Sequence, residues 1–131
     1  MNRTLLRRLL LFGTGLTFLA IAVVSWIIPT TVAAQYSLTL DTPGSWNQFR
    51  AVYAGFWVGL FVLMATAARR VEDARLGDLC AILILCQALA RGASLVCDGV
   101  PESRFLAAAG GELATALAIL ALRPQGGAHG A

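Results

Sequence analysis

The chain alternates between long apolar runs and short polar connections. Four runs of roughly 20 residues are predominantly apolar, and several segments are apolar around the whole circumference of a helix, which is typical of helices that face lipid. At 1.5 Å per residue, about 20 helical residues cross the roughly 30 Å hydrocarbon layer of a bilayer. The pattern therefore predicts membrane spans at about residues 9–28, 46–68, 77–97 and 104–122.

The connections differ in charge, and this difference predicts the orientation of the chain. Arginines precede the first run and follow the second, whereas the first connection, residues 30–45, has no basic residue. Because short arginine-rich loops stay in the cytoplasm, both termini are predicted to be cytoplasmic. We expect Ser45 or Asn47 to cap the second span, and the Gly-rich tail 125–131 to be disordered. The arginines are Arg3, Arg7, Arg8, Arg69, Arg70 and Arg75.

The first run has an alternative interpretation, which is a signal peptide whose removal would delete residues 1–34. The small residues of Thr31-Val32-Ala33-Ala34 stand before Gln35, where a signal peptidase would cut. The apolar run is longer than the roughly 7–15 residues of a signal h-region, so we favour a retained span.

Composition supports a single membrane domain covering residues 1–131. Hydrophobic residues make up 58% of the 131 residues and charged residues 13%, which is too apolar for an ordinary soluble domain. The net charge of +3 comes from arginines at helix ends, without a basic patch interleaved with aromatics, so nucleic acid is not an expected partner. The predicted fold is an all-α four-helix bundle in a bacterial cytoplasmic membrane.

Motifs for metal, cofactor or enzyme chemistry are missing from the sequence. Cys80, Cys86 and Cys97 form no CxxC pair and have no histidine nearby, so we expect neither a metal nor a cofactor. The sequence also has no GxSxG, P-loop, HExxH or dinucleotide-binding motif. A non-enzymatic role is therefore favoured.

Three charged residues lie well inside the predicted spans, and each needs a partner there. An unpaired guanidinium in hydrocarbon costs roughly 3 to more than 10 kcal/mol, so such a group normally faces protein, water or a counter-charge. Arg50 on the second span, Arg91 on the third and Glu112 on the fourth all fall in the half of the membrane nearest the external connections. We expect them to meet in one polar cluster.

Polar residues at helical spacing support this cluster. Residues spaced four, three and four apart form one polar stripe on the third span, and residues three and four away from Arg50 share its face on the second span. Glycines near these positions, such as Gly55, Gly92 and Gly111, are expected to let helix backbones approach closely. The supporting residues are Gln87, Ser94 and Asp98 on the third span, and Asn47, Ala54 and the neighbouring Tyr53 on the second.

The cluster admits three interpretations. Glu112 ties Arg50 and Arg91 together and only fixes the helix register, or the two arginines bind a carboxylate, phosphate or lipid headgroup. In the third, Glu112 transfers protons in a small transporter or membrane enzyme. Membrane lipids are the expected partners, and the chain is alternatively an accessory subunit of a larger membrane complex or a homo-oligomer.

Several segments resemble the small bacterial membrane proteins grouped as a domain of unknown function, DUF4345. The resemblance covers nearly all of the chain and implies a four-helix integral membrane protein, but no activity, substrate or cofactor. The family pattern has Asn-Glu-x-Arg followed by Tyr-Gly-Gly, so Gln48 stands where an acid is usual and Ala54 where a glycine is usual. The segments are L-T-L-D-T-P at 38–43, N-Q-F-R-A-V-Y-A-G at 47–55, R-G-A-S-L-V-C-D-G-V-P at 91–101 and G-E-L at 111–113.

Overall fold

The computed structural model describes residues 2–124, which fall into two compact units. Unit 1 comprises Met1–Leu11 and Thr66–Ala131, and unit 2 comprises Phe12–Ala65. The described residues form helices and contain no strand. Four helical segments are long and apolar enough to cross a membrane, which confirms the predicted all-helical fold with four span-length segments. These segments are Arg3–Ile27, Pro43–Arg69, Ala74–Cys97 and Ser103–Ala121. The predicted disordered tail, residues 125–131, lies outside the described residues.

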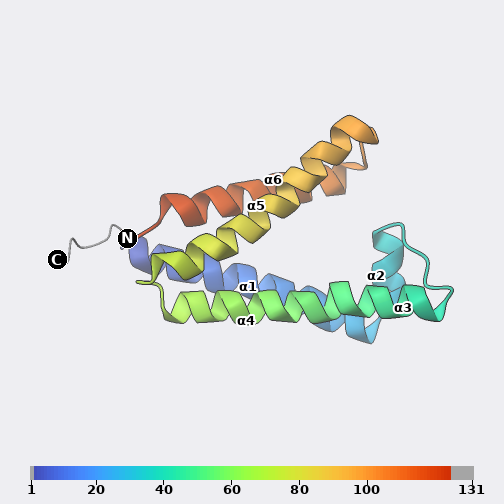
Figure 1. The fold of residues 1–131 in the computed structure, drawn as a ribbon, viewed down its shortest axis with the longest axis horizontal. Coiled ribbons are helices and arrows are strands. Elements are labelled where there is room, and N and C mark those ends of the chain that lie inside the picture. Colours follow the sequence, from blue (N-terminus) through green and yellow to red (C-terminus); the bar gives the residue numbers. More distant parts are fainter. Residues whose placement is uncertain (1, 125–131) are drawn as a thin grey trace. The chain divides into compact units, whose positions relative to one another are not determined.

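Unit 1 is built on two antiparallel helices, α5 (Ala74–Cys97) and α6 (Ser103–Ala121), together with the start of α1 (Arg3–Ile27) (Figure 1). The turn between α5 and α6 contains Gly99 at φ 95°, a backbone conformation that glycine adopts without a steric penalty. Nη2 of Arg3 donates a hydrogen bond to the carbonyl oxygen of Ala121 at 2.6 Å. The start of α1 and the end of α6 therefore lie at the same end of unit 1.

Unit 2 contains the rest of α1, the short helices α2 (Pro29–Gln35) and α3 (Pro43–Phe49), the π-helix η1 (Arg50–Phe56) and most of α4 (Trp57–Arg69). Helices α1 and α4 pack closely at Gly15, where an added Cβ would lie 3.1 Å from Cβ of Met64. Phe18 packs edge-on against Trp57, with ring centroids 5.8 Å apart. Small and aromatic residues thus hold this helix pair together.

The structure shows a short helix in the connection at residues 30–45 and corrects the expected cap of the second span. The short helix α2 begins at Pro29, whose fixed φ suits the first turn of a helix. Thr42, not Ser45 or Asn47, caps α3: its side chain accepts from the Ser45 backbone N–H, and the Ser45 side chain accepts from the Thr42 N–H. This capping box fixes where the second apolar segment begins.

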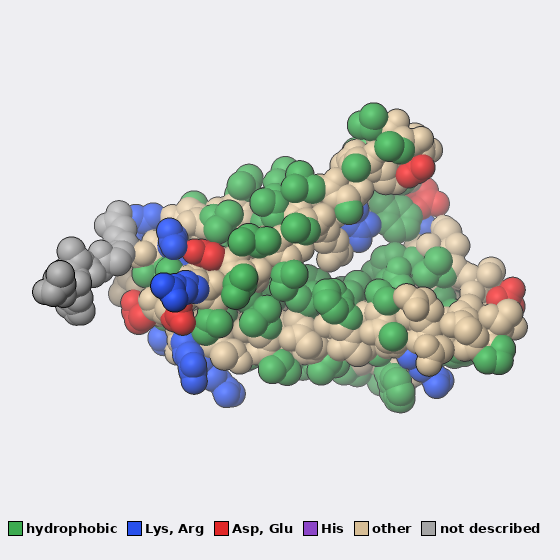
Figure 2. All heavy atoms as spheres, in the orientation of Figure 1, with side chains coloured by type: hydrophobic (Ala, Val, Ile, Leu, Met, Phe, Trp, Pro, Cys, Tyr) green, Lys and Arg blue, Asp and Glu red, His purple; other side chains and the backbone are tan. Residues whose placement is uncertain are grey.

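Large apolar side chains cover much of the helix surface in both units. Figure 2 shows them on the visible face, with arginines and acids gathered near helix ends. Val96 is 87% exposed and Ile27 is 69% exposed, which is typical of lipid-facing positions rather than of a soluble surface. At Gly92 and Gly111, an added Cβ would meet no atom of a neighbouring element within 4 Å among the described residues.

Candidate functional site

Arg50 is the first residue of η1, a stretch of π-helix within the second long apolar segment. Such i→i+5 turns are rare and are frequently found at functional sites. Arg50 is exposed, whereas Ala54, four residues further along η1, is buried.

The Arg50 guanidinium lies against two indoles of unit 2. Its Cζ is 5.1 Å from the ring centroid of Trp26 and 5.3 Å from that of Trp46. A cation–π contact contributes about 0.5–1 kcal/mol at an exposed site and about 2 kcal/mol or more when desolvated. Within unit 2, all of whose residues are described, Arg50 forms neither an ion pair nor a side-chain hydrogen bond. The indoles therefore position a cation whose N–H donors are free to bind a ligand.

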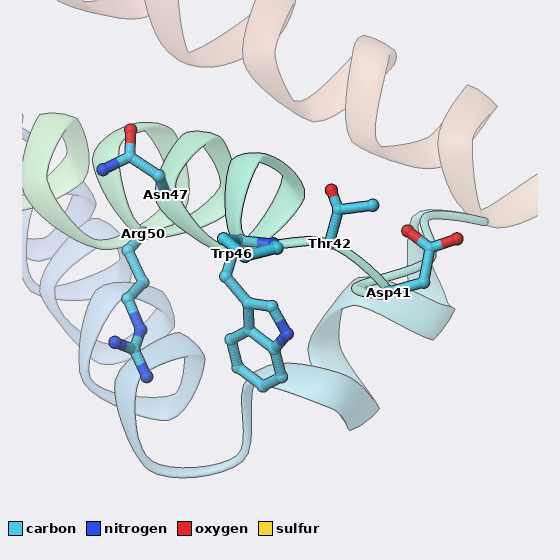
Figure 3. Close-up of a pocket in the computed structure, with 6 residues that line it drawn as sticks. Asp41, Thr42, Trp46, Asn47 and Arg50 are labelled. Carbon is cyan, nitrogen blue, oxygen red and sulfur yellow. The ribbon is translucent and has the colours of Figure 1, made fainter.

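A cavity of about 500 Å³ lies beside Arg50, at the start of α3. This volume falls within the roughly 300–1,000 Å³ of small-ligand sites. In Figure 3, Trp46 and Arg50 point to one side of the helix, as expected for residues four apart, while Asn47 points to another side. Asn47 and Arg50 nevertheless line the same cavity. The full lining is Asp41, Thr42, Pro43, Trp46, Asn47 and Arg50.

Tyr53 belongs to an aromatic cluster in unit 2. Its ring stacks on that of Phe49, with centroids 4.8 Å apart and an interplanar angle of 18°, and lies 4.9 Å from the ring of Tyr36. Phe49 is buried with Val32 and Ala33 from α2. Tyr53 thus helps to pack α2 against the second long segment.

In unit 1, Arg91 on α5 and Glu112 on α6 form the ion pair that the sequence predicts. Nε of Arg91 lies 3.0 Å from Oε2 and 3.2 Å from Oε1 of Glu112, and Nε2 of Gln87 donates to Oε1 at 2.8 Å. The Arg91 side chain is 27% exposed and that of Glu112 is 16% exposed. Among the described residues, nothing accepts a hydrogen bond from Nη1 or Nη2 of Arg91, so these nitrogens are available to a ligand.

Ser94 and Asp98, also predicted to support the cluster, bond to each other near the end of α5. Oγ of Ser94 donates to Oδ2 of Asp98 at 2.7 Å. They do not hydrogen-bond to the Arg91–Glu112 pair. Their i, i+4 contact instead links the last turn of α5 to the residue that follows the helix.

The predicted meeting of Arg50 with Arg91 and Glu112 involves both units. The contacts described for Arg50 lie in unit 2, and those of Arg91 and Glu112 lie in unit 1. A joint cluster of all three residues therefore stays a prediction.

Sequence reasoning missed a second ion-pair network, at the arginine-rich end of unit 1. Arg7 is completely buried, and its Nη2 donates to Oδ1 of Asp78 at 2.8 Å and to the Ala74 carbonyl oxygen at 3.3 Å. The exposed Arg123 reaches the same carboxylate, with Nε 2.9 Å from Oδ2. The available signal was Asp78, an acid inside the predicted third span for which no partner was sought.

Gly77 makes room for the buried guanidinium. A Cβ added there would lie 2.8 Å from Cζ of Arg7 and 3.0 Å from its Nε, so any larger residue displaces Arg7. Nε and Nη1 of Arg7 are buried without a hydrogen-bond partner among the described residues. The position of Arg7 thus depends on a single carboxylate, that of Asp78, together with the Ala74 carbonyl.

No three His, Cys, Asp or Glu side chains within residues 2–124 gather closely enough to hold a metal ion. Cys80 is buried in α5, whereas Cys86 and Cys97 are exposed, and all three are free thiols.

A family model described as a domain of unknown function (DUF4345) matches residues 6–123. The chain belongs to the DUF4345 family. The expected resemblance is confirmed, and the DUF4345 match includes the Arg50 cavity, the Arg91–Glu112 pair and the Arg7–Asp78 pair. No curated protein and no solved structure matches the chain.

Proposed function

We propose that this protein spans a bacterial cytoplasmic membrane four times, with both termini in the cytoplasm, and binds the anionic group of a lipid headgroup or small molecule through Arg50. The observation that carries the proposal is the state of Arg50: an exposed guanidinium, held between two indoles, without an acidic partner in unit 2 and facing a cavity of about 500 Å³. Guanidinium groups bind phosphate and carboxylate bidentately.

The surroundings of Arg50 suit a ligand at the membrane surface. Tryptophan concentrates at the level of lipid headgroups, where its ring is apolar and its N–H is polar. Trp26 and Trp46 flank Arg50, and Trp26 is 62% exposed. The π-helix that begins at Arg50 adds a local distortion of a kind often found at binding sites.

Arg91 is a second candidate donor, on unit 1. Glu112 engages its Nε, which leaves Nη1 and Nη2 to a ligand. A proton-transfer role for Glu112 is less favoured, because Arg91 and Gln87 already engage both oxygens of its carboxylate.

The proposal is tested by titrating lipid or small anions into the full-length chain in detergent and following tryptophan fluorescence. Arg50→Gln should lower affinity at least tenfold, because it removes the charge and the fork of donors. Arg104→Gln is the matched control, since Arg104 is an exposed arginine already paired with Glu102. Equal binding by wild type and Arg50→Gln would overturn the proposal.

A further inference from the structure

The ion pair of Arg91 and Glu112 in unit 1 combines a cancelled charge with unused hydrogen-bond donors. Both carboxylate oxygens of Glu112 accept from Nε of Arg91, at 3.0 and 3.2 Å, and the formal charges of the two side chains sum to zero. Within residues 2–124, no atom accepts a hydrogen bond from Nη1 or Nη2 of Arg91. These two nitrogens form the end of the planar guanidinium group, and their parallel N–H bonds suit one acceptor group.

The charge of this pair favours a neutral ligand over an anion. The Arg91 and Glu112 side chains are only 27% and 16% exposed, so water screens charges poorly there. An anion at Nη1 and Nη2 would add a second negative charge near the Glu112 carboxylate and leave the cluster with a net charge. A neutral carbonyl oxygen accepts from the same N–H groups without adding charge. Arg50 differs, because no acid of unit 2 pairs with it and two indoles are its contacts.

The position of Arg91 along α5 places these donors below the lipid headgroups in the proposed membrane orientation. Arg91 lies about 9 Å along the helix from Cys97, the last residue of α5. Long helical side chains lean toward the helix N-terminus, and Gln87, one turn nearer that end, donates to the same Oε1 of Glu112. Since Glu112 holds Nε, the guanidinium cannot extend to the headgroup level as that of a free arginine does. The ligand must therefore bring its acceptor oxygen into the hydrocarbon layer.

Open space and apolar side chains adjoin the pair. At Gly92 and Gly111, each next to a member of the pair in the sequence, an added Cβ would meet no atom of a neighbouring element within 4 Å among the described residues. Leu89 on α5 is 61% exposed, and Leu113 on α6 is 42% exposed. The surroundings therefore suit a ligand whose body is apolar.

We propose that Nη1 and Nη2 of Arg91 bind the carbonyl oxygen of a neutral apolar molecule of the quinone type. The carbonyl oxygen of a quinone has both lone pairs in the plane of the ring, which matches two parallel N–H groups. The apolar body of a quinone enters hydrocarbon, whereas the ester carbonyls of a phospholipid stay near the headgroups. The inference concerns a site other than Arg50 and rests on the proposed function only for the membrane location.

The test measures binding of three probes to the full-length chain in a neutral detergent by isothermal titration calorimetry. Decyl-ubiquinone carries ring carbonyls, methyl oleate an ester carbonyl and oleate a carboxylate. Wild type should bind decyl-ubiquinone most tightly of the three. Arg91→Lys should weaken this binding roughly tenfold, because lysine keeps the charge opposite Glu112 but lacks the guanidinium fork. Arg104→Lys is the matched control and should bind as wild type does, because Arg104 is an exposed arginine on α6 already paired with Glu102.

Unchanged binding of decyl-ubiquinone by Arg91→Lys would overturn the inference, and so would tighter binding of oleate or methyl oleate by wild type. Should Arg91→Lys not fold, Glu112→Gln decides the inference. This variant leaves Arg91 without a counter-charge, so its preference should change from decyl-ubiquinone to oleate, and an unchanged preference would contradict the charge argument. Anion binding by wild type and Arg50→Gln tests the proposed function separately, so either proposal can fail alone.

Discussion

The guanidinium of Arg7 is completely buried in unit 1, and Oδ1 of Asp78 lies 2.8 Å from its Nη2. Removing one partner of a buried ion pair leaves an uncompensated charge, which is far more costly than losing an exposed pair. Loss of Asp78 should therefore destabilise the protein far more than loss of an acid from an exposed ion pair.

Asp78→Asn should lower the free energy of unfolding by about 3–5 kcal/mol, because it leaves Arg7 buried without a counter-charge. Glu102→Gln is the control: Glu102 and Arg104 form an exposed pair, and its loss should cost about 0–1 kcal/mol. Denaturant unfolding in detergent, followed by circular dichroism, measures both. Equal stability of the two variants would show that the Arg7–Asp78 pair is not a structural tie.

Gly77→Ala should destabilise by about 1–3 kcal/mol, because the new methyl group overlaps the Arg7 guanidinium and that group cannot move without losing Asp78. Gly92→Ala on the same helix meets no neighbour within 4 Å and should instead stabilise by about 0.5–1 kcal/mol. In a chain carrying Arg7→Met, Gly77→Ala should lower the free energy of unfolding by less than it does in the wild type. If the loss of stability is the same in both chains, the added methyl group does not act through Arg7.

Arg91 and Glu112 should show a coupling energy of about 0.5–3 kcal/mol in a double-mutant cycle built from Arg91→Gln and Glu112→Gln. The pair is partly buried, and Gln87 holds the same carboxylate. A parallel cycle on the exposed Arg104–Glu102 pair should give about 0.2–1 kcal/mol. Coupling at Arg91–Glu112 no larger than in this reference cycle would contradict a structural contribution.

Cys97 should react with a membrane-impermeant maleimide added outside intact spheroplasts, in a chain carrying Cys80→Ala and Cys86→Ala. It is exposed at the end of α5 opposite the arginine-rich connection, and arginine-rich loops stay in the cytoplasm. Glu72→Cys in a chain without other cysteines should react only after permeabilisation. The reverse pattern would invert the predicted orientation.

The sequence predicts the four long segments well, because a continuous apolar run is a strong signal that depends on little else. It also predicts the Arg91–Glu112 pair, since charges inside two adjacent apolar helices must find partners. Both predictions rest on the free-energy cost of placing polar groups in hydrocarbon. This cost does not depend on which helices pack together.

The sequence does not predict that Arg7 is buried. An arginine just before an apolar run is typical of a solvated flank, whereas the observed contacts of Arg7 are with Ala74, Gly77 and Asp78, far along the chain on α5. The third apolar run contains Gly77 and Asp78 next to each other. A counter-charge beside a residue without a side chain was the available signal for a buried arginine. Linking them to Arg7 requires knowing which helices pack together, and hydrophobic periodicity does not provide that.

The π-helix η1 affects how positions along the second long segment are counted. An α-helix turns by about 100° per residue, and a turn closed by an i→i+5 bond holds one residue more than an α turn. A helical wheel drawn through the whole segment at one fixed angle per residue therefore does not relate the residues before Arg50 correctly to those after Phe56. Residues before Arg50 and after Phe56 follow two separate helical phases. A one-residue insertion or deletion within η1 would rotate the cavity around the helix axis while leaving the contact between Gly15 and Met64 in place.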